Sequence, residues 1–153
     1  MSEPTSSAPA ASRSEYTWAF LMLRLFLGLR TFLEGVEKFE KNGTYSSANY
    51  HENMGRLAQG ITGASFLPLW ATRGYANVLG YVLIVLGAAL LLGVKTRTTL
   101  ILTGLLYVSL SFGLMAVQEN EGVAWLGVYI GLIAGALVLV RHDRFALWGG
   151  GSP

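Results

Sequence analysis

Four apolar runs of about 20 residues each constrain the fold of this chain more than any other feature of its sequence. The hydrocarbon core of a bilayer is about 30 Å thick and requires roughly 20 apolar residues in a spanning helix. Charged residues make up only 13% of the chain, about half the share usual in a soluble domain. We therefore predict an all-α integral membrane protein, a four-helix bundle with helices at about residues 16–40, 74–94, 98–117 and 122–140.

The spans divide the chain into one domain with a short tail at each end. Residues 1–15 are rich in Ser, Ala and Pro, a composition typical of a disordered segment. They lack the cationic region, short apolar core and cleavage site of a secretory signal. We expect residues 16–148 to form a single transmembrane domain and residues 149–153 to form a flexible tail.

The first apolar run differs from the others because it also carries charged side chains. A charge in hydrocarbon costs at least about 2.5–3.5 kcal/mol. On a helix, Arg30, Glu34 and Lys38 are spaced i, i+4, i+8 and line one side with alternating sign. Arg24 lies about 10 Å from Tyr16 along the helix, well inside the apolar layer.

Two interpretations of these charges remain open. In the first, they pair among themselves, extend to the interface and hold the bundle together. In the second, Arg24 and Glu34 line a polar cavity for a ligand, a proton or a quinone headgroup. Ionisable residues inside a membrane are commonly functional, which favours testing the second interpretation.

Residues 44–73 form the longest segment outside the predicted spans, and the turn Asn42-Gly43 precedes them. Within the segment, apolar residues fall at i, i+3, i+4, i+7, which predicts an amphipathic helix: Met54, Leu57, Ala58 and Ile61. Phe66 and Trp70 follow and are typical of a membrane interface. We expect an interfacial helix between the first two spans that covers the mouth of the bundle, or acts as a lid over a cavity.

Hydroxyl side chains recur every fourth residue along the third span, at Thr99, Thr103, Tyr107 and Ser111. Such hydroxyls bond either to their own backbone, to a neighbouring helix, or to a ligand in a polar cavity. The last alternative gives a candidate ligand-binding set taken from three helices: Arg24, Glu34, Lys38, Tyr81 and Tyr107. No catalytic residue can be assigned from the sequence.

Glycines mark the faces on which helices can approach closely. Gly80 and Gly87 lie seven residues apart in the second span, and Gly127, Gly131 and Gly135 are spaced by four in the last span. The second pattern is a doubled G-x-x-x-G, which is typical of close helix contact in membranes. The contact is either inside the bundle or with another subunit.

Residue types narrow the range of cofactors and partners. The chain has no cysteine, and His51 and His142 are its only histidines, so no metal site is expected. No glycine-rich dinucleotide loop follows a strand. The net charge of +2 does not indicate nucleic-acid binding. The expected partners are the lipid bilayer and either other membrane-protein subunits or further copies of the chain.

The distribution of basic residues predicts the orientation. One side of the predicted bundle carries five Lys and Arg residues and the other four: Arg13, Lys95, Arg97, Arg141 and Arg144 against Lys38, Lys41, Arg56 and Arg73. The positive-inside rule then places both termini in the cytoplasm and residues 42–73 outside. We expect a multi-pass protein of the bacterial inner membrane.

Two short motifs resemble those of DoxX-like membrane proteins. Leu23-Arg24-Leu25 with Gly28, followed by Gly35 and Lys38-Phe39, is similar to the first-helix pattern of that family. The run LLGVKTR at residues 91–97 is similar to the family's turn after the second helix. Glu34 replaces the small residue or His that many members carry there. The long segment 44–73 resembles the DoxD-like branch, the membrane subunit of thiosulfate:quinone oxidoreductase.

The resemblance implies a four-helix fold and electron delivery toward a membrane quinone, the one cofactor it indicates. The first functional hypothesis is a non-catalytic subunit or anchor of a redox or respiratory assembly, with a quinone or lipid site. The second is a stand-alone quinone-linked oxidoreductase, for which no electron-carrying motif is visible. The third is a small proton or solute transporter, although four helices without an internal repeat are few for one.

Overall fold

The computed structural model describes residues 10–145 and 147, with side chains from residue 14 onward. Within that range the chain is helical apart from a small β-hairpin. The elements follow in the order α1 (Ala10–Glu37), β1 (Glu40–Lys41), β2 (Thr44–Tyr45), α2 (Ser47–Ala64), α3 (Leu69–Leu92), α4 (Thr96–Ala116), α5 (Asn120–Leu139) and the 3₁₀ turn η1 (Val140–His142).

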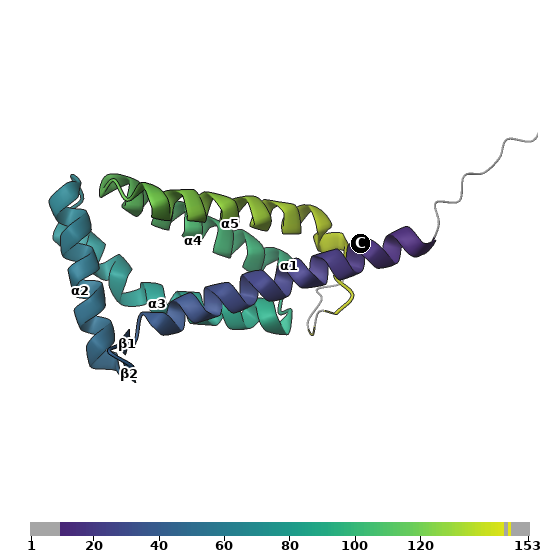
Figure 1. The fold of residues 1–153 in the computed structure, drawn as a ribbon, viewed down its shortest axis with the longest axis horizontal. Helices are drawn as coiled ribbons and strands as arrows, with labels where there is room; N and C mark the ends of the chain where they lie inside the picture. Colours follow the sequence, from purple (N-terminus) through teal and green to yellow (C-terminus); the bar gives the residue numbers. More distant parts are fainter. Residues whose placement is uncertain (1–9, 146, 148–153) are drawn as a thin grey trace, which may run out of the picture.

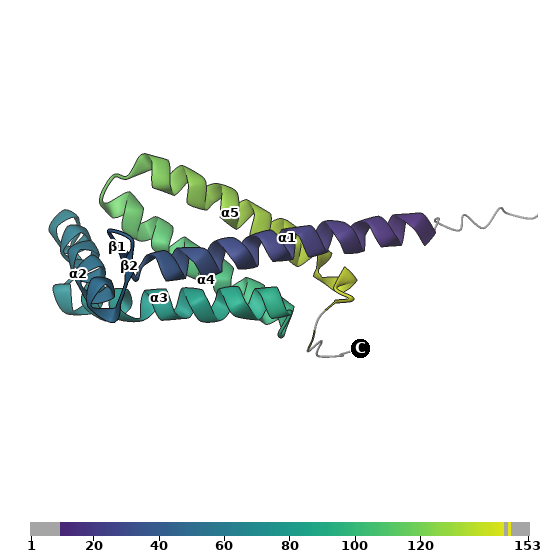
Figure 2. The ribbon, with the colours of Figure 1, turned by 60° about the horizontal axis from the view of Figure 1, so that its bottom comes forward.

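Four of the helices run side by side along the long axis, and α2 lies across one end of them (Figure 1). α1 packs mainly against α3, and α4 packs mainly against α5. A view turned by 60° shows the same arrangement, with α1 extending past its neighbours at the end opposite α2 (Figure 2). α2 therefore closes one end of the molecule, and the start of α1 and η1 lie at the other.

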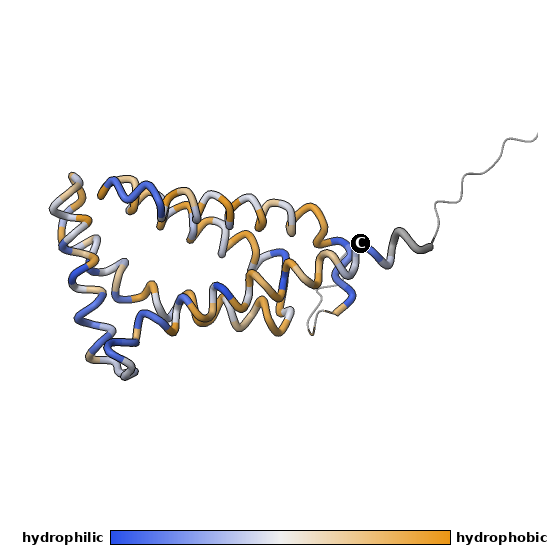
Figure 3. The backbone as a smooth tube through the Cα atoms, viewed as in Figure 1, coloured by the Kyte–Doolittle hydropathy of each residue, from blue (hydrophilic) through white to orange (hydrophobic). Residues whose placement is uncertain are grey.

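Three helical segments are long and apolar enough to cross a membrane: α3, α4 and Asn120–His142. Apolar residues dominate along α3, α4 and α5, whereas α2 and its surroundings are more hydrophilic (Figure 3). These segments confirm helices at three of the predicted runs, each beginning earlier than the hydropathy indicated, at Leu69, Thr96 and Asn120. α1, which carries Arg24, Arg30 and Glu34, is not among these segments.

α1 begins six residues before the predicted start of the first helix. Its first turns include Ala10 and Ala11, and alanine is the strongest helix former. Residues 10–15, which their composition predicted to be disordered, are thus helical. The rest of that predicted tail, residues 1–9, and the predicted tail 149–153 lie outside the described residues.

The turn predicted at Asn42-Gly43 joins β1 to β2. Both residues have positive φ, 53° and 79°, as a two-residue type I′ hairpin requires. Glu40 pairs with Tyr45 and Lys41 with Thr44. The hairpin reverses the chain at the end of α1, and Ser46 then caps α2 by accepting a hydrogen bond from the backbone of Asn49.

Glycine faces bring α1 and α3 into close contact. A Cβ on Gly87 would collide with the backbone of Phe32, and one on Gly28 would lie 3.0 Å from the backbone nitrogen of Leu91. Gly80 is equally crowded, with the ring of Tyr50 over it. The close packing predicted from Gly80 and Gly87 is therefore confirmed, and it fixes the position of the charged first helix.

The glycines of α5 behave differently. Gly127, Gly131 and Gly135 are exposed, and a Cβ added at any of them would meet nothing within 4 Å. They make no contact inside the described part of the chain. Of the two alternatives for this stripe, packing inside the bundle is excluded for the described residues.

Candidate functional site

A half-open cavity of about 410 Å³ lies where all five helices converge, next to α2. α1 and the turn that follows it contribute the charged stripe: Arg30 and Glu34 on α1, and Lys38 directly after it. The other helices contribute mainly apolar and aromatic side chains, among them Leu57, Ile61, Leu79, Leu110, Trp125 and Tyr129. The volume falls within the range of small-molecule sites, and the lining has their usual character of an apolar wall with a few polar groups.

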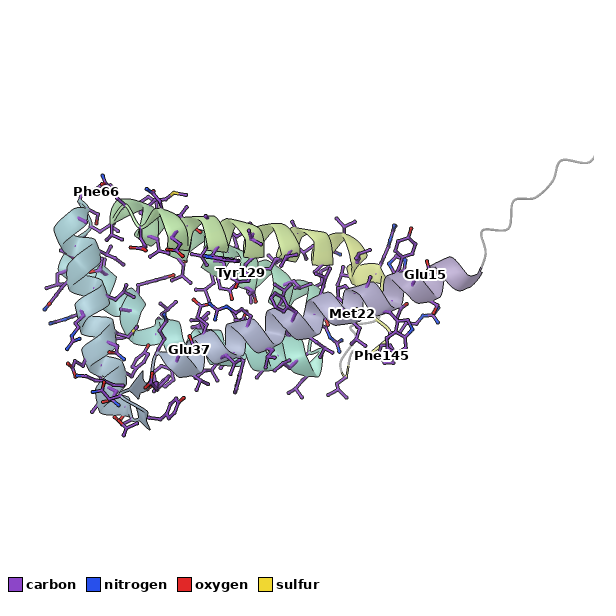
Figure 4. All side chains as sticks on the ribbon, viewed as in Figure 1. Glu15, Met22, Glu37, Phe66, Tyr129 and Phe145 are labelled. Atoms are coloured by element: carbon purple, nitrogen blue, oxygen red, sulfur yellow. The ribbon has the colours of Figure 1, made fainter. Side chains whose placement is uncertain are left out.

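Tyr129 holds the first charge of the stripe in place. Its side chain reaches from α5 into the space between α5 and α1 (Figure 4). The Arg30 Nε donates a hydrogen bond to the Tyr129 hydroxyl at 3.2 Å, and the guanidinium carbon lies 5.5 Å from the ring centre. The guanidinium thus has a cation–π contact and one hydrogen bond, and its remaining N–H groups stay available.

Glu34 is held from the opposite wall. The Tyr107 hydroxyl lies 3.4 Å from the Glu34 carboxylate and 2.9 Å from the Thr31 hydroxyl. Tyr107 and Thr31 are fully buried, so this pair forms a fixed polar base behind the carboxylate. Glu34 itself is only partly buried and lines the cavity.

Within the part of the chain that the structure describes, no ion pair neutralises the stripe. Among residues 14–145, Arg30, Glu34 and Lys38 form no salt bridge within 4 Å with any side chain. Two cations and an anion therefore border one apolar cavity. Such groups in a low-dielectric wall are costly unless water or a ligand satisfies them.

A smaller apolar hollow of about 210 Å³ adjoins the cavity between α3 and α4. The two spaces share Ile61, Tyr75, Ser109 and Gly113. The Tyr75 and Ser109 hydroxyls are hydrogen-bonded at 2.6 Å across the boundary. This hydrogen-bonded pair of side chains thus separates the charged cavity from a second, more apolar space.

α2 covers the end of the bundle through a buried tyrosine. The Tyr50 hydroxyl donates to the carbonyl of Ala76 or Asn77, at 2.7 and 2.8 Å, and accepts the N–H of Gly80 at 3.1 Å. This hydroxyl therefore joins α2 to the backbone of α3, and α3 bends where it passes α2 (Figure 1). The predicted amphipathic face is present: Met54 and Ala58 are buried.

The structure divides the candidate residues predicted from the sequence. Glu34 and Lys38 line the cavity, and Tyr107 lies one hydrogen bond behind Glu34. Tyr81 does not belong to the site: it is half exposed and packs edge-on against the rings of Phe39 and Tyr50. The hydropathy pattern could not distinguish the two sides of α3 at that position.

Arg24 also lies outside the cavity, contrary to the expectation that it shares a polar space with Glu34. Its Nη1 donates to the Asp143 carboxylate at 2.8 Å, and its Nη2 donates to the Phe145 carbonyl at 3.3 Å. The side chains of Arg24 and Asp143 are both more than nine-tenths buried. Side chains on a helix lean toward its N-terminus, so Arg24 reaches the opposite end of the molecule from the cavity.

Three of the four stripe hydroxyls on α4 bond to the backbone. Thr99 donates to Val94, Thr103 to Thr99, and Ser111 to Tyr107. Only the Tyr107 hydroxyl reaches another helix. The stripe is therefore mainly internal to α4 and does not line the cavity.

Sequence reasoning missed part of the site. Arg30 lay on the recognised stripe, four residues before Glu34, and this spacing was the available signal. No signal in the sequence indicated Tyr129, Trp125 or the hydrogen-bonded pair Tyr75 and Ser109, because aromatic and hydroxyl residues are common in membrane helices. The described residues contain no group of three or more His, Cys, Asp or Glu side chains that could hold a metal ion.

Comparison of the chain with protein-family models, with curated proteins and with solved structures finds no match. Function must therefore be inferred from the geometry of the cavity and its surroundings.

Proposed function

We propose that this chain is a four-span, DoxX-like membrane protein that binds the polar headgroup of an apolar-tailed ligand of the quinone class. The observation that carries the proposal is the cavity itself, in which Arg30, Glu34 and Lys38 border an otherwise apolar space. In this view the protein serves a redox or respiratory assembly in a bacterial inner membrane, and a partner subunit supplies the electrons.

The surface of α1 supports a fourth span. Every large residue exposed along its outward face between residues 18 and 33 is apolar: Trp18, Met22, Leu25, Phe26, Leu29 and Leu33. The charges point the other way, toward Asp143 or the cavity. From Trp18 to Lys38 the helix rises about 30 Å, the thickness of a hydrocarbon core.

The position of α2 supports an interfacial helix on the outer side. It lies across the end of the other helices (Figure 1), and its outward face is polar. The following residues Phe66 and Trp70 are strongly exposed, as expected of side chains at headgroup level. The opposite end carries Lys95, Arg97, Arg141 and Arg144, which favours placing that end and both termini in the cytoplasm.

The chemistry of the cavity fits a quinone. The two carbonyl oxygens of a quinone ring accept hydrogen bonds, and Arg30 and Lys38 supply cationic donors. Glu34 can exchange a proton with the ring oxygen when the charge of the ring changes. The isoprenoid tail needs an apolar route to the lipid, and the hollow behind Tyr75 and Ser109 lies between α3 and α4.

The test uses Trp125, which lines the cavity, as a fluorescent reporter. Replacing Trp18, Trp70 and Trp148 by Phe leaves Trp125 as the single tryptophan of the chain. Titration of the detergent-solubilised protein with a short-tailed ubiquinone should quench this fluorescence saturably. Arg30→Gln or Glu34→Gln should weaken binding about tenfold or more, as expected for the loss of a charged hydrogen bond.

Tyr81→Phe is the matched control, because Tyr81 lies outside the cavity and half exposed. It should leave the quenching curve unchanged. Linear, non-saturating quenching, or equal curves for Arg30→Gln and Tyr81→Phe, would contradict the proposed site.

A specific observation also favours a partner helix. Gly127, Gly131 and Gly135 form an exposed face on α5 with open space above them. Close packing of a second membrane helix on this face would bury it, as in other glycine-based contacts. Gly131→Leu should release a co-purifying subunit or a second copy in native mass spectrometry. Gly60→Leu, on α2 and equally uncrowded, should not.

A further inference from the structure

A second polar hollow lies at the other end of the molecule. It has a volume of about 360 Å³ and is lined by Thr17, Arg141, His142 and Arg144. Thr17 belongs to α1, and the other three residues belong to η1 and the segment that follows it. The hollow shares no residue with the cavity, so it requires a separate explanation.

The charge of this hollow is uncompensated. Asp143, the carboxylate between the two arginines in sequence, is bound to Arg24 at 2.8 Å and is nearly buried. Among residues 14–145, neither Arg141 nor Arg144 forms an ion pair, and both are exposed. Because Arg24 neutralises Asp143, the two remaining guanidinium groups present a net charge of about +2 to an anion.

Contacts with α1 hold the basic segment in place. The Phe145 carbonyl accepts a hydrogen bond from Arg24, and the His142 ring lies 5.3 Å from the ring of Tyr16. The His142 Nδ1 is buried and has no hydrogen-bond partner within the described residues. These contacts hold the segment that carries Arg141 and Arg144 against α1.

Aromatic residues indicate the depth of this hollow in a membrane. The rings of Trp18 and Phe145 lie 5.9 Å apart, and each is about half exposed. Figure 4 shows Phe145 beside the first part of α1. Exposed tryptophan and phenylalanine together at the end of an apolar surface are typical of the interface. Thr17, Arg141 and Arg144 then lie at the level of lipid phosphates.

We propose that this hollow binds the phosphodiester of an anionic phospholipid. Guanidinium groups bind phosphate oxygens through paired, charge-assisted hydrogen bonds, and basic pockets on the cytoplasmic side recognise anionic headgroups. The acyl chains would lie along the apolar outward face of α1, whose Trp18 and Met22 are exposed. The bound lipid would cover the junction between α1 and the Arg24–Asp143 pair.

Native mass spectrometry of the full chain in detergent tests this proposal. Phosphatidylglycerol and phosphatidylcholine with identical acyl chains are titrated separately. The wild-type chain should bind one phosphatidylglycerol at least about tenfold more tightly than phosphatidylcholine. The double variant Arg141→Gln/Arg144→Gln should lose that preference. Both residues are exposed, so the fold should persist.

The matched control is Lys95→Gln/Arg97→Gln, which removes two charges at the same end without touching the hollow. It should change phosphatidylglycerol binding by less than about twofold. Equal losses in both double variants, or equal wild-type binding of the two lipids, would overturn the proposal. Displacement of phosphatidylglycerol by millimolar inorganic phosphate would also overturn it, in favour of a free-phosphate site.

Discussion

The two ends of α1 use charged residues in opposite ways. Toward its N-terminus, Arg24 is more than nine-tenths buried, and its two terminal nitrogens donate to Asp143 and to the Phe145 carbonyl. Toward its C-terminus, Arg30, Glu34 and Lys38 border a cavity of about 410 Å³ and have no ion-pair partner in the described chain. Arg24 and Arg30 lie only six positions apart on one helix, yet the first is held in an ion pair and the second borders a cavity.

The difference arises from what packs opposite each charge. The C-terminal segment returns to α1 and brings a carboxylate to Arg24. Arg30 and Glu34 instead border the cavity, and within the described residues their hydrogen-bond partners are the phenol groups of Tyr129 and Tyr107. A charge within an apolar run is therefore an incomplete guide to function, because the partner that decides its role can come from a distant part of the sequence.

Breaking the Arg24–Asp143 pair should have the largest effect on stability. Arg24→Leu leaves the Asp143 carboxylate buried and unpaired, which costs about 3–5 kcal/mol. The double variant Arg24→Leu/Asp143→Leu should regain a large part of that loss. Thermal unfolding in detergent, followed by circular dichroism, measures both. Stability of Arg24→Leu within about 1 kcal/mol of wild type would show that the pair does not hold this end.

A Gly→Ala substitution should have different effects on stability at a tightly packed position and at the cavity wall. Gly28→Ala places a methyl group 3.0 Å from the Leu91 backbone and should destabilise the protein by about 1–3 kcal/mol. Gly113→Ala, at the cavity wall, meets only the end of Ile61 at 3.4 Å. It should be neutral or slightly stabilising. Equal unfolding temperatures for the two variants would remove this contrast.

Weakening the contact of α2 with α3 should affect only the end of the molecule that holds the cavity. Tyr50→Phe removes the hydroxyl bonded to Ala76 and Gly80, a loss of about 1 kcal/mol. Amide exchange should quicken in α2 and in the first turns of α3, while the segment around Arg24 keeps its protection. Uniformly faster amide exchange over the whole chain would contradict a local role for the contact between α2 and α3.

Acid should have the smallest effect, confined to the outer surface of α2. Lys41, with help from Arg56, lowers the pKa of Glu52 below its ordinary value of 4.5. A lowered folded pKa means that the stabilisation is present above the unfolded pKa and is lost as pH falls through the folded pKa. Proteolysis near the β-hairpin should therefore rise slightly below about pH 4.5, and Glu52→Gln should abolish that dependence. A pH dependence unchanged in Glu52→Gln would assign it to another group.

Local sequence patterns predicted the parts of this fold that depend on neighbours in sequence. Apolar runs located α3, α4 and α5, the Asn42-Gly43 pair located the turn but not the strands that flank it, and the period of Met54 and Ala58 located α2. The stripe of Glu34 and Lys38 was visible for the same reason. These features follow from helix and turn geometry alone.

Features that depend on distant residues could not be predicted in this way. The pairing of Arg24 with Asp143 joins residues 119 apart, and Tyr107 reaches Thr31 across 76 residues. The outward direction of Gly127, Gly131 and Gly135 depends on which face of α5 meets α4. Such choices are made by packing in three dimensions, which a single sequence does not reveal.

The most direct test of the account is the occupant of the cavity in protein gently extracted from its own membrane. Native mass spectrometry with identification of the released molecules should find one apolar-tailed ligand per chain, of the quinone class. Leu110→Trp fills the cavity wall and should lose that ligand, whereas Leu105→Trp, on the exposed side of α4, should retain it. An empty wild-type chain, or the same ligand in both variants, would contradict a binding site in the cavity that Arg30, Glu34 and Lys38 border.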